Sequence, residues 1–128
     1  MDTNVLLDVF LPDPKWGPSS KAALDKAFQQ GSLVINKIIY AELSPQFSEK
    51  QLLDNTLGLL GFQIISLDLE SAYQAGMKWK MYREKGGRRN RVLADFLIGA
   101  HAENHSDCFL TRDRGFYQNY FKNLKIVY

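Results

Sequence analysis

The sequence has only one cysteine, Cys108, among its 128 residues. A single cysteine excludes an internal disulfide, and a reducing cytoplasmic location is therefore expected. Cys108 lies in an apolar run typical of a strand, which predicts an inert buried thiol rather than a nucleophile. No run of about 18 apolar residues is present, which excludes an ordinary membrane-spanning helix. No basic and then apolar leader opens the sequence, so no export signal is expected.

Several motifs of familiar enzyme classes are also missing. The sequence contains no G-x-S-x-G motif, no P-loop and no G-x-G-x-x-G motif, which argues against serine hydrolases and two large groups of nucleotide-binding enzymes. His101 and His105 lie one helical turn apart, as two zinc ligands on a helix often do. The residues between them do not complete an H-E-x-x-H motif, and no third nitrogen or sulfur ligand is evident, so zinc is not favoured.

Apolar runs of strand length alternate with helical stretches along the chain, which is typical of an α/β fold with a parallel sheet. With 45% hydrophobic residues and no linker, residues 1–128 are expected to form a single domain. The pattern predicts strands at residues 33–35, 62–67, 107–111 and 124–127, and helices at residues 4–10, 20–30, 37–43, 49–60, 69–84, 91–104 and 115–121.

A further strand is expected to end at about Asp2, where only Met1 precedes it. A central strand normally needs about five residues. Two explanations are open at this point: residues before Met1 are missing from this chain, or the first strand is cut short.

Four acidic residues far apart in the sequence carry the functional hypothesis. Asp95 lies among apolar residues on a helix, where an isolated buried carboxylate would be costly or would take up a proton. Asp2 and Asp113 follow strands, and ligands of open parallel sheets bind just beyond such strand ends. Glu42, which alone would be read as a solvated side chain, has an apolar setting. We therefore expect these four acids to gather around divalent metal, whereas Asp8 is expected to be structural.

Three of these acids also have a purely structural interpretation. Asp2 would cap the helix that follows it. Asp95 would be held by the free N–H groups of a first helical turn. Asp113 would be a turn residue that pairs with Arg112 or Arg114.

The basic residues are concentrated in one segment. Residues 78–91 contain seven basic residues and one acidic residue, whereas the rest of the chain has nine basic and 13 acidic residues. Trp79 and Tyr82 are interleaved with these charges, a pattern typical of proteins that contact the phosphates and unpaired bases of RNA. A solvated helix face and loop is the alternative interpretation. The residues expected to contact RNA are Arg83, Lys85, Arg88, Arg89 and Arg91.

The segments around the four acids have a recognisable order. Asp2-Thr3-Asn4 opens the chain, Glu42 lies on the helix after the second strand, Asp95 lies within Leu93-Ala94-Asp95-Phe96-Leu97-Ile98, and Thr111-Arg112-Asp113 follows the fourth strand. This order resembles the PIN-domain ribonucleases over essentially the whole chain. The length resembles the VapC-type toxins of bacterial toxin–antitoxin pairs.

The resemblance implies a three-layer α/β/α sandwich whose central parallel sheet has the strand order 3-2-1-4-5, with Asp2 and Asp113 on adjacent strands. It also implies an endoribonuclease that uses Mg²⁺ or Mn²⁺, ions that prefer oxygen ligands, and cleaves transfer or ribosomal RNA. Asn4 and Thr111 resemble the polar residues that orient the acids. Because crowded carboxylates repel, at least one acid should have a raised pKa in the metal-free protein.

The resemblance further implies a homodimer, a small VapB-type antitoxin and a larger toxin–antitoxin assembly. An alternative function is a catalytically silent RNA- or protein-binding module on the same fold. A phosphatase or phosphoacceptor domain with an aspartate nucleophile is disfavoured. Such chemistry needs a lysine after the fourth strand, and this chain has Thr111, Arg112 and Asp113 there.

Overall fold

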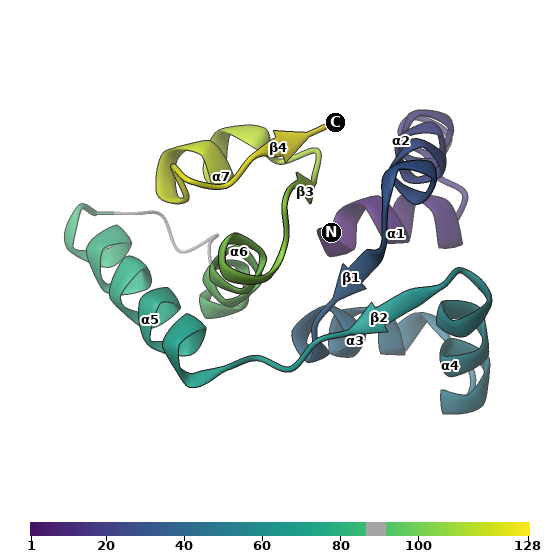
Figure 1. Ribbon diagram of the computed structural model, residues 1–128, viewed down its shortest axis with the longest axis horizontal. Helices are drawn as coiled ribbons and strands as arrows, with labels where there is room; N and C mark the ends of the chain where they lie inside the picture. The colour runs from purple at the N-terminus through teal and green to yellow at the C-terminus, as the bar shows by residue number, and fades with distance from the viewer. Residues whose placement is uncertain (87–91) are drawn as a thin grey trace.

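The computed structural model describes residues 1–86 and 92–128, which form an α/β fold (Figure 1). In these residues, no helix is long and apolar enough to cross a membrane. The elements in chain order are α1 (Thr3–Phe10), α2 (Gly17–Gln30), β1 (Leu33–Ile35), α3 (Lys37–Leu43), the 3-10 helix η1 (Ser44–Gln46), α4 (Lys50–Leu59), β2 (Phe62–Ile64), α5 (Leu69–Glu84), α6 (Leu93–His105), β3 (Phe109–Leu110), α7 (Arg114–Tyr120) and β4 (Ile126–Val127).

Helices α3 and α5 begin where the sequence predicts, because a polar side chain caps each of them. The side chains of Asn36 and Asp68 accept hydrogen bonds from the backbone N–H groups three residues later, at 3.0 and 3.2 Å. Helix α2 begins earlier than predicted, at Gly17, with Pro18 in its first turn. Proline is favoured there because the first N–H groups of a helix have no partner within the helix.

The strands form two parallel pairs. β1 pairs with β2, so that Leu33 lies opposite Phe62, and β3 pairs with β4, so that Phe109 lies opposite Ile126. In the described residues, the hydrogen-bonded ladders form two separate two-stranded sheets and not one continuous five-stranded ladder. β3 starts only at Phe109, and Cys108, predicted to be a buried strand residue, is exposed.

Met1 and Asp2 lie between the two pairs of strands. The N–H of Asp2 donates to the carbonyl of Leu110 in β3 at 2.8 Å, and the amino group of Met1 lies 3.4 Å from the carbonyl of Val34 in β1. Two residues are too few to form a ladder of hydrogen bonds, so the first predicted strand is reduced to these two contacts. The full strand order 3-2-1-4-5 stays a prediction.

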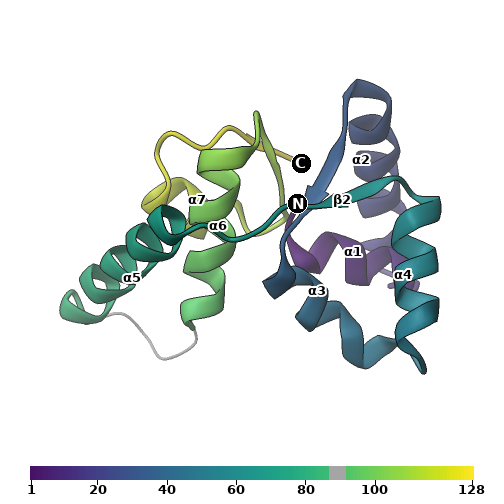
Figure 2. The same cartoon turned by 60° about the horizontal axis from the view of Figure 1, so that its bottom comes forward.

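The helices lie on two sides of this junction. Figures 1 and 2 show α1 to α4 on one side and α5 to α7 on the other, with the N-terminus between them. Helix α1 packs against α2 and α3, and α5 packs along α6. Helix α3 also contacts α6, so the two sides are joined by helix packing as well as by backbone hydrogen bonds.

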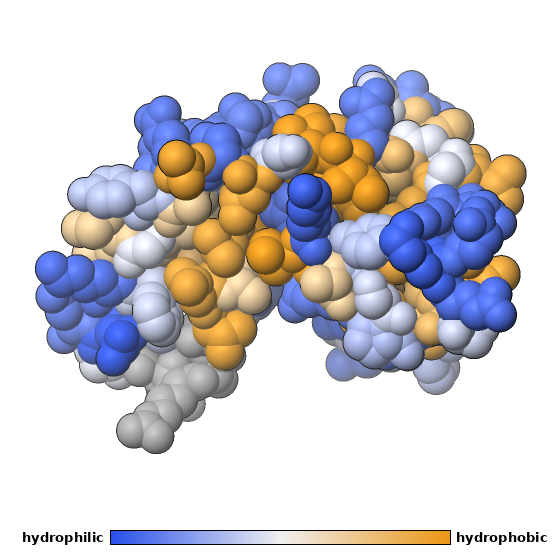
Figure 3. Space-filling model, turned by 90° about the horizontal axis from the view of Figure 1, so that it is seen from below, coloured by the Kyte–Doolittle hydropathy of each residue, from blue (hydrophilic) through white to orange (hydrophobic). Residues whose placement is uncertain are grey.

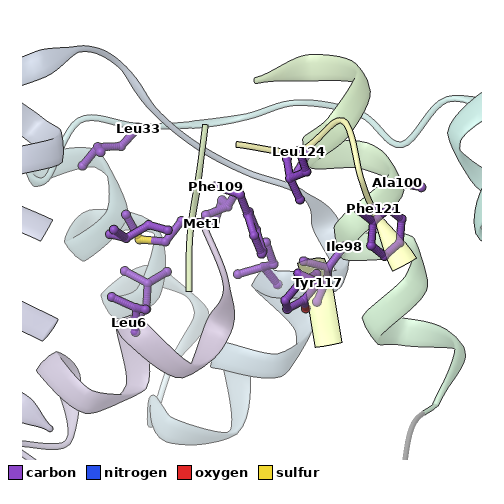
Figure 4. Packing of buried hydrophobic residues seen from close by; sticks show 14 of the residues in the cluster. Met1, Leu6, Leu33, Ile98, Ala100, Phe109, Tyr117, Phe121 and Leu124 are labelled. Carbon is purple, nitrogen blue, oxygen red and sulfur yellow. The ribbon is translucent and has the colours of Figure 1, made fainter. Parts of the chain in front are cut away.

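The hydrophobic core continues across the junction. Phe109 of β3 is fully buried, and its ring lies 4.7 Å from that of Tyr117. In Figure 4, Phe109 lies between Met1 and Leu6 on one side and Ile98 and Tyr117 on the other. The first residues of the chain are therefore fixed by core packing as well as by hydrogen bonds.

Helix α6 approaches the C-terminal aromatic residues so closely that it needs a glycine. A Cβ atom at Gly99 would lie 2.3 Å from the ring of Phe121. Phe96, also on α6, makes edge-to-face contacts with Phe116 and Tyr120. The N-terminal half of α6, which carries Asp95, is therefore held firmly against α7.

Candidate active site

Asp2 is the most buried of the four predicted acids. It precedes α1 and is only 7% exposed. Its Oδ2 atom accepts hydrogen bonds from the Thr111 hydroxyl at 2.6 Å and from the Asn4 side-chain amide at 2.9 Å. Asp2 is the N-cap residue of α1, but its side chain makes no capping hydrogen bond to the helix. Thr111 and Asn4 contact this acid directly.

Burial raises the pKa of Asp2 to about 6. The Thr111 hydroxyl and the nearby amino group of Met1 oppose this shift, whereas the negative charge of Asp95 adds to it. One acid thus has a raised pKa, as predicted, but burial and not the predicted repulsion between acids is the main cause. The influence of Asp95 also means that two acids separated by more than 90 residues in the sequence act on each other in the fold.

Asp95 lies in the first turn of α6, as predicted. Its Oδ2 atom lies 3.3 Å from the backbone N–H of Val92, which donates to it. The first-turn interpretation therefore describes one of its contacts, without excluding a ligand role. Asp95 itself is half-buried, whereas the later residues Ile98 and Ala100 are buried.

Glu42 reaches the same region from α3. The hydroxyl of Thr3, the residue after Asp2, donates to Glu42 Oε1 at 2.7 Å. This contact joins the α3 acid to the start of α1. Thr3 could not be singled out from the sequence, because its partner lies 39 residues away.

Asp113 is connected to Asp2 through Thr111. Its backbone N–H donates to the Thr111 hydroxyl oxygen at 3.0 Å, and the same hydroxyl donates to Asp2. The neighbouring arginines are used elsewhere: Arg112 forms an ion pair with Asp8, and Arg114 donates to the carbonyl of Tyr128.

The donors around Asp2 fit a divalent cation by their chemistry. Carboxylate and amide oxygens are the ligands that Mg²⁺ and Mn²⁺ prefer. The Asn4 Oδ1 atom is buried and has no hydrogen-bond partner within the described chain, so an oxygen next to Asp2 is available to a cation. In residues 1–86 and 92–128, however, no group of three or more His, Cys, Asp or Glu side chains is arranged to hold a metal ion. The four acids do not form a complete cage.

Comparison with protein families identifies the fold that carries these acids. The model of the PIN domain family matches residues 1–122. The chain belongs to the PIN domain family. A search of curated proteins found no match to this PIN domain.

A solved structure has a similar fold. The crystal structure of VapBC2 from Rickettsia felis, bound to a DNA fragment from the promoter of the pair, contains a chain that aligns with a TM-score of 0.72. The alignment covers 98% of this PIN domain and 94% of that chain, at 20% sequence identity. At this identity the likeness concerns the fold.

The basic segment of the PIN domain divides into residues with different roles. Lys78 donates to the carbonyl of Tyr120 at 2.7 Å, at the end of α7. Tyr82, predicted to be available for base stacking, is buried against Phe96. Arg83 is exposed and lies over the ring of Trp79 at 4.9 Å.

The other basic residues predicted to contact RNA divide between the described and the undescribed part of the chain. Lys85 is exposed at the end of α5. Arg88, Arg89 and Arg91 lie outside the described residues.

The two histidines of α6 serve the fold. His105 lies 2.6 Å from Asp68, the capping residue of α5, and His101 lies 3.2 Å from the carbonyl of Ser66. Burial and the neighbouring His105 lower the pKa of His101. These contacts hold α6 against the segment before α5.

Proposed function

We propose that this PIN domain is a metal-dependent endoribonuclease and the toxin of a VapC-type toxin–antitoxin pair. One observation carries the proposal: Asp2 is a carboxylate only 7% exposed, which accepts hydrogen bonds from the neutral side chains of Thr111 and Asn4. The Asn4 Oδ1 atom is buried and has no hydrogen-bond partner within the described chain, so the oxygens gathered here favour a bound cation. Family membership supports a nuclease, and the likeness to a VapBC2 chain supports the toxin context.

Asp2 and Asp95 are the residues that would hold Mg²⁺ or Mn²⁺, with Glu42 and Asp113 as the further acidic residues of the site. Mg²⁺ is usually bound through one or two carboxylates and keeps several waters, so a complete protein cage is not required. When bound, such an ion would supply a water of lowered pKa and positive charge near the attacked phosphate. We assign a catalytic role to all four acids.

The residues around Asp2 orient it for this role. Thr111 and Asn4 both donate to one oxygen of Asp2, at 2.6 and 2.9 Å, which restricts rotation of the carboxylate. Thr111 also accepts the backbone N–H of Asp113. One hydroxyl thereby fixes the spacing between two acids that come from different ends of the sequence.

The RNA substrate, transfer or ribosomal RNA, would lie along the basic segment. Arg83 and Lys85 are exposed, and Arg88, Arg89 and Arg91 complete the proposed contact set. Arginine and lysine neutralise the phosphates of the backbone.

The proposed assembly is a homodimer with a VapB-type antitoxin, in the cytoplasm. Helix α5 carries a series of exposed hydrophobic residues, Leu69, Tyr73, Met77 and Met81, and hydrophobic patches alternate with hydrophilic ones on the face in Figure 3. Exposed apolar side chains of this kind support contact with another protein. We also propose that residues 1–128 form one domain with the strand order 3-2-1-4-5.

The test compares Asp2→Asn and Asp95→Asn with a matched surface control, Asp25→Asn. Asp25 pairs with Lys21 at 2.7 Å on the surface of α2, so the control removes one carboxylate charge away from the site. We expect RNA cleavage to fall by at least about 100-fold in the first two variants, the scale of losing a preorganised electrostatic contact. Unchanged cleavage in both would disprove the assignment of these acids.

The second candidate is a binding module without catalysis. It is favoured by one observation, namely that no three acids of the described chain are arranged around a common metal position. Titration with Mn²⁺ separates the candidates, because a module without a metal site shows no metal-dependent rise in its melting temperature.

A further inference from the structure

The loop between β3 and α7 is attached to both ends of helix α1. At the start of α1, Thr111 donates to Asp2 at 2.6 Å. At the other end, Arg112 donates to Asp8 through two parallel hydrogen bonds, from Nε to Oδ2 at 2.7 Å and from Nη2 to Oδ1 at 2.9 Å. Adjacent loop residues thus contact acids six positions apart on one short helix.

The second attachment is partly buried and geometrically specific. The side chain of Asp8 is 5% exposed and that of Arg112 is 30% exposed. A two-pronged arginine–carboxylate pair fixes orientation as well as distance. Ser20 of α2 donates to Asp8 at 2.6 Å, and the Arg112 guanidinium lies 5.1 Å from the ring centre of Trp16. The pair is therefore held from α1, from α2 and from the segment between them.

Arg112 stands between the two loop residues that belong to the proposed site. Thr111 precedes it and orients Asp2, and Asp113 follows it and is one of the four acids. Thr111 and Asp113 are themselves joined by the hydrogen bond from Asp113 N–H to the Thr111 hydroxyl at 3.0 Å. A movement of Arg112 away from Asp8 would shift both neighbours relative to Asp2.

We infer that the ion pair of Asp8 and Arg112 is a positioning device, which sets the β3–α7 loop so that the Thr111 hydroxyl reaches Asp2 and the backbone of Asp113 stays beside Thr111. Neither Asp8 nor Arg112 is a catalytic residue in this proposal. Its consequence for metal binding rests on the proposed function, whereas its consequence for the loop itself does not.

The test uses Arg112→Gln, which removes the charge and the paired donors, and Arg112→Lys, which keeps the charge but not the two-pronged geometry. Leu53→Ala is the control: Leu53 is 1% exposed in α4, so its truncation destabilises the core away from the loop. The first readout is amide hydrogen exchange of Asp113 in the metal-free protein, measured by NMR. The second is the dissociation constant for Mn²⁺, measured below the melting temperature of each variant.

We expect Asp113 exchange to accelerate by about tenfold in Arg112→Gln, a loss of protection of the size that one strong local interaction provides, and to accelerate less in Arg112→Lys. Mn²⁺ affinity should fall by about 10- to 100-fold in Arg112→Gln, as for other residues that orient metal ligands. Leu53→Ala should lower the melting temperature without either change. Asp8→Asn keeps the shape of the side chain and should also accelerate the exchange of the Asp113 amide. This variant replaces Arg112→Gln in the test if Arg112→Gln does not fold.

The inference is overturned if the Arg112 and Asp8 variants lose stability but keep the Asp113 exchange rate and the Mn²⁺ affinity of Leu53→Ala. Failure of the proposed function would look different. In that case the unaltered protein would neither bind Mn²⁺ nor cleave RNA, while Asp113 exchange would still report whether Arg112 positions the loop.

Discussion

Helix α1 has a buried aspartate at each end, and the two are compensated differently. Asp8, 4% exposed, is paired with the guanidinium of Arg112. Asp2, 7% exposed, accepts hydrogen bonds from the neutral side chains of Thr111 and Asn4, and its pKa is raised to about 6. A side-chain cation of the protein itself binds the structural acid, whereas the acid of the proposed site has neutral donors. The second arrangement suits a carboxylate that binds a cation from solution.

The largest effect on stability is expected from removing the positive charge of Arg112, which pairs with Asp8. Arg112→Leu leaves Asp8 buried without its charge partner, and we expect a loss of about 3–5 kcal/mol in the free energy of unfolding. Urea denaturation measures this loss. Lys21→Ala, which breaks an exposed pair with Asp25 at 2.7 Å, is the control and should cost at most about 1 kcal/mol. Equal losses in both variants would contradict the comparison.

At Asp2, at the other end of α1, removing the side-chain charge is expected to raise the free energy of unfolding and not to lower it. Because the pKa of Asp2 is about 6 in the folded protein and 3.8 ordinarily, the folded state keeps a proton that the unfolded state has lost. Stability should therefore fall as pH rises from about 4 to about 6 and then stay level, by at most about 3 kcal/mol. Asp2→Asn should remove this fall and be more stable than the unaltered protein at pH 7 without metal.

Urea denaturation at several pH values in the presence of a chelator measures this difference. Asp25→Asn is again the control, since its carboxylate is on the surface and 57% exposed. The deciding quantity is the free energy of unfolding of Asp2→Asn minus that of the unaltered protein. If this difference is no larger at pH 7 than at pH 4, burial of the Asp2 charge does not lower stability.

A cation from solution should replace the missing compensation at Asp2. At a Mn²⁺ concentration 100 times the dissociation constant, we expect a gain of about 2.7 kcal/mol in stability. Thermal unfolding with and without Mn²⁺ checks this gain. Asp25→Asn should gain as much stability from Mn²⁺ as the unaltered protein, and Asp2→Asn should not. An equal gain in both variants would show that Mn²⁺ does not bind at Asp2.

The smallest effect concerns the exposed side of the site. Thr3→Ala removes the 2.7 Å hydrogen bond to Glu42, and we expect a loss of about 0.5–1.5 kcal/mol because Glu42 is exposed to solvent. Chemical denaturation again gives the value. Thr3→Ser keeps the hydroxyl and should recover most of the stability that Thr3→Ala loses. A loss in Thr3→Ala well above about 1.5 kcal/mol would show that Glu42 is as constrained as Asp2.

The sequence predicted the local features well. Asn36 and Asp68 cap α3 and α5, because capping depends on residues three positions apart. A raised pKa among the acids was predicted from repulsion between crowded carboxylates, whereas its main cause at Asp2 is burial. Asp95 lies in the first turn of α6 because this helix begins at Leu93 and not at residue 91.

The features that failed or were missed depend on distant partners. Asp8 was predicted to be structural, but its partner Arg112 lies 104 residues away. Tyr82 follows the basic pattern in sequence, yet the packing of α5 on α6 buries it against Phe96. In place of the predicted first strand, Met1 and Asp2 make one backbone contact each, with Val34 of β1 and Leu110 of β3. Each outcome was decided by tertiary packing, which overrides local pattern.

The hydrogen bond from Lys78 to the end of α7 has a consequence for how RNA binding should respond to salt. Lys78 is held by the Tyr120 carbonyl and the Phe121 ring, so it would release no counterions when RNA binds. The logarithm of the affinity falls with the logarithm of the salt concentration by about 0.7 for each phosphate neutralised on a single strand. Lys78→Met should thus leave that slope unchanged, whereas Arg83→Met should make it shallower by about 0.7.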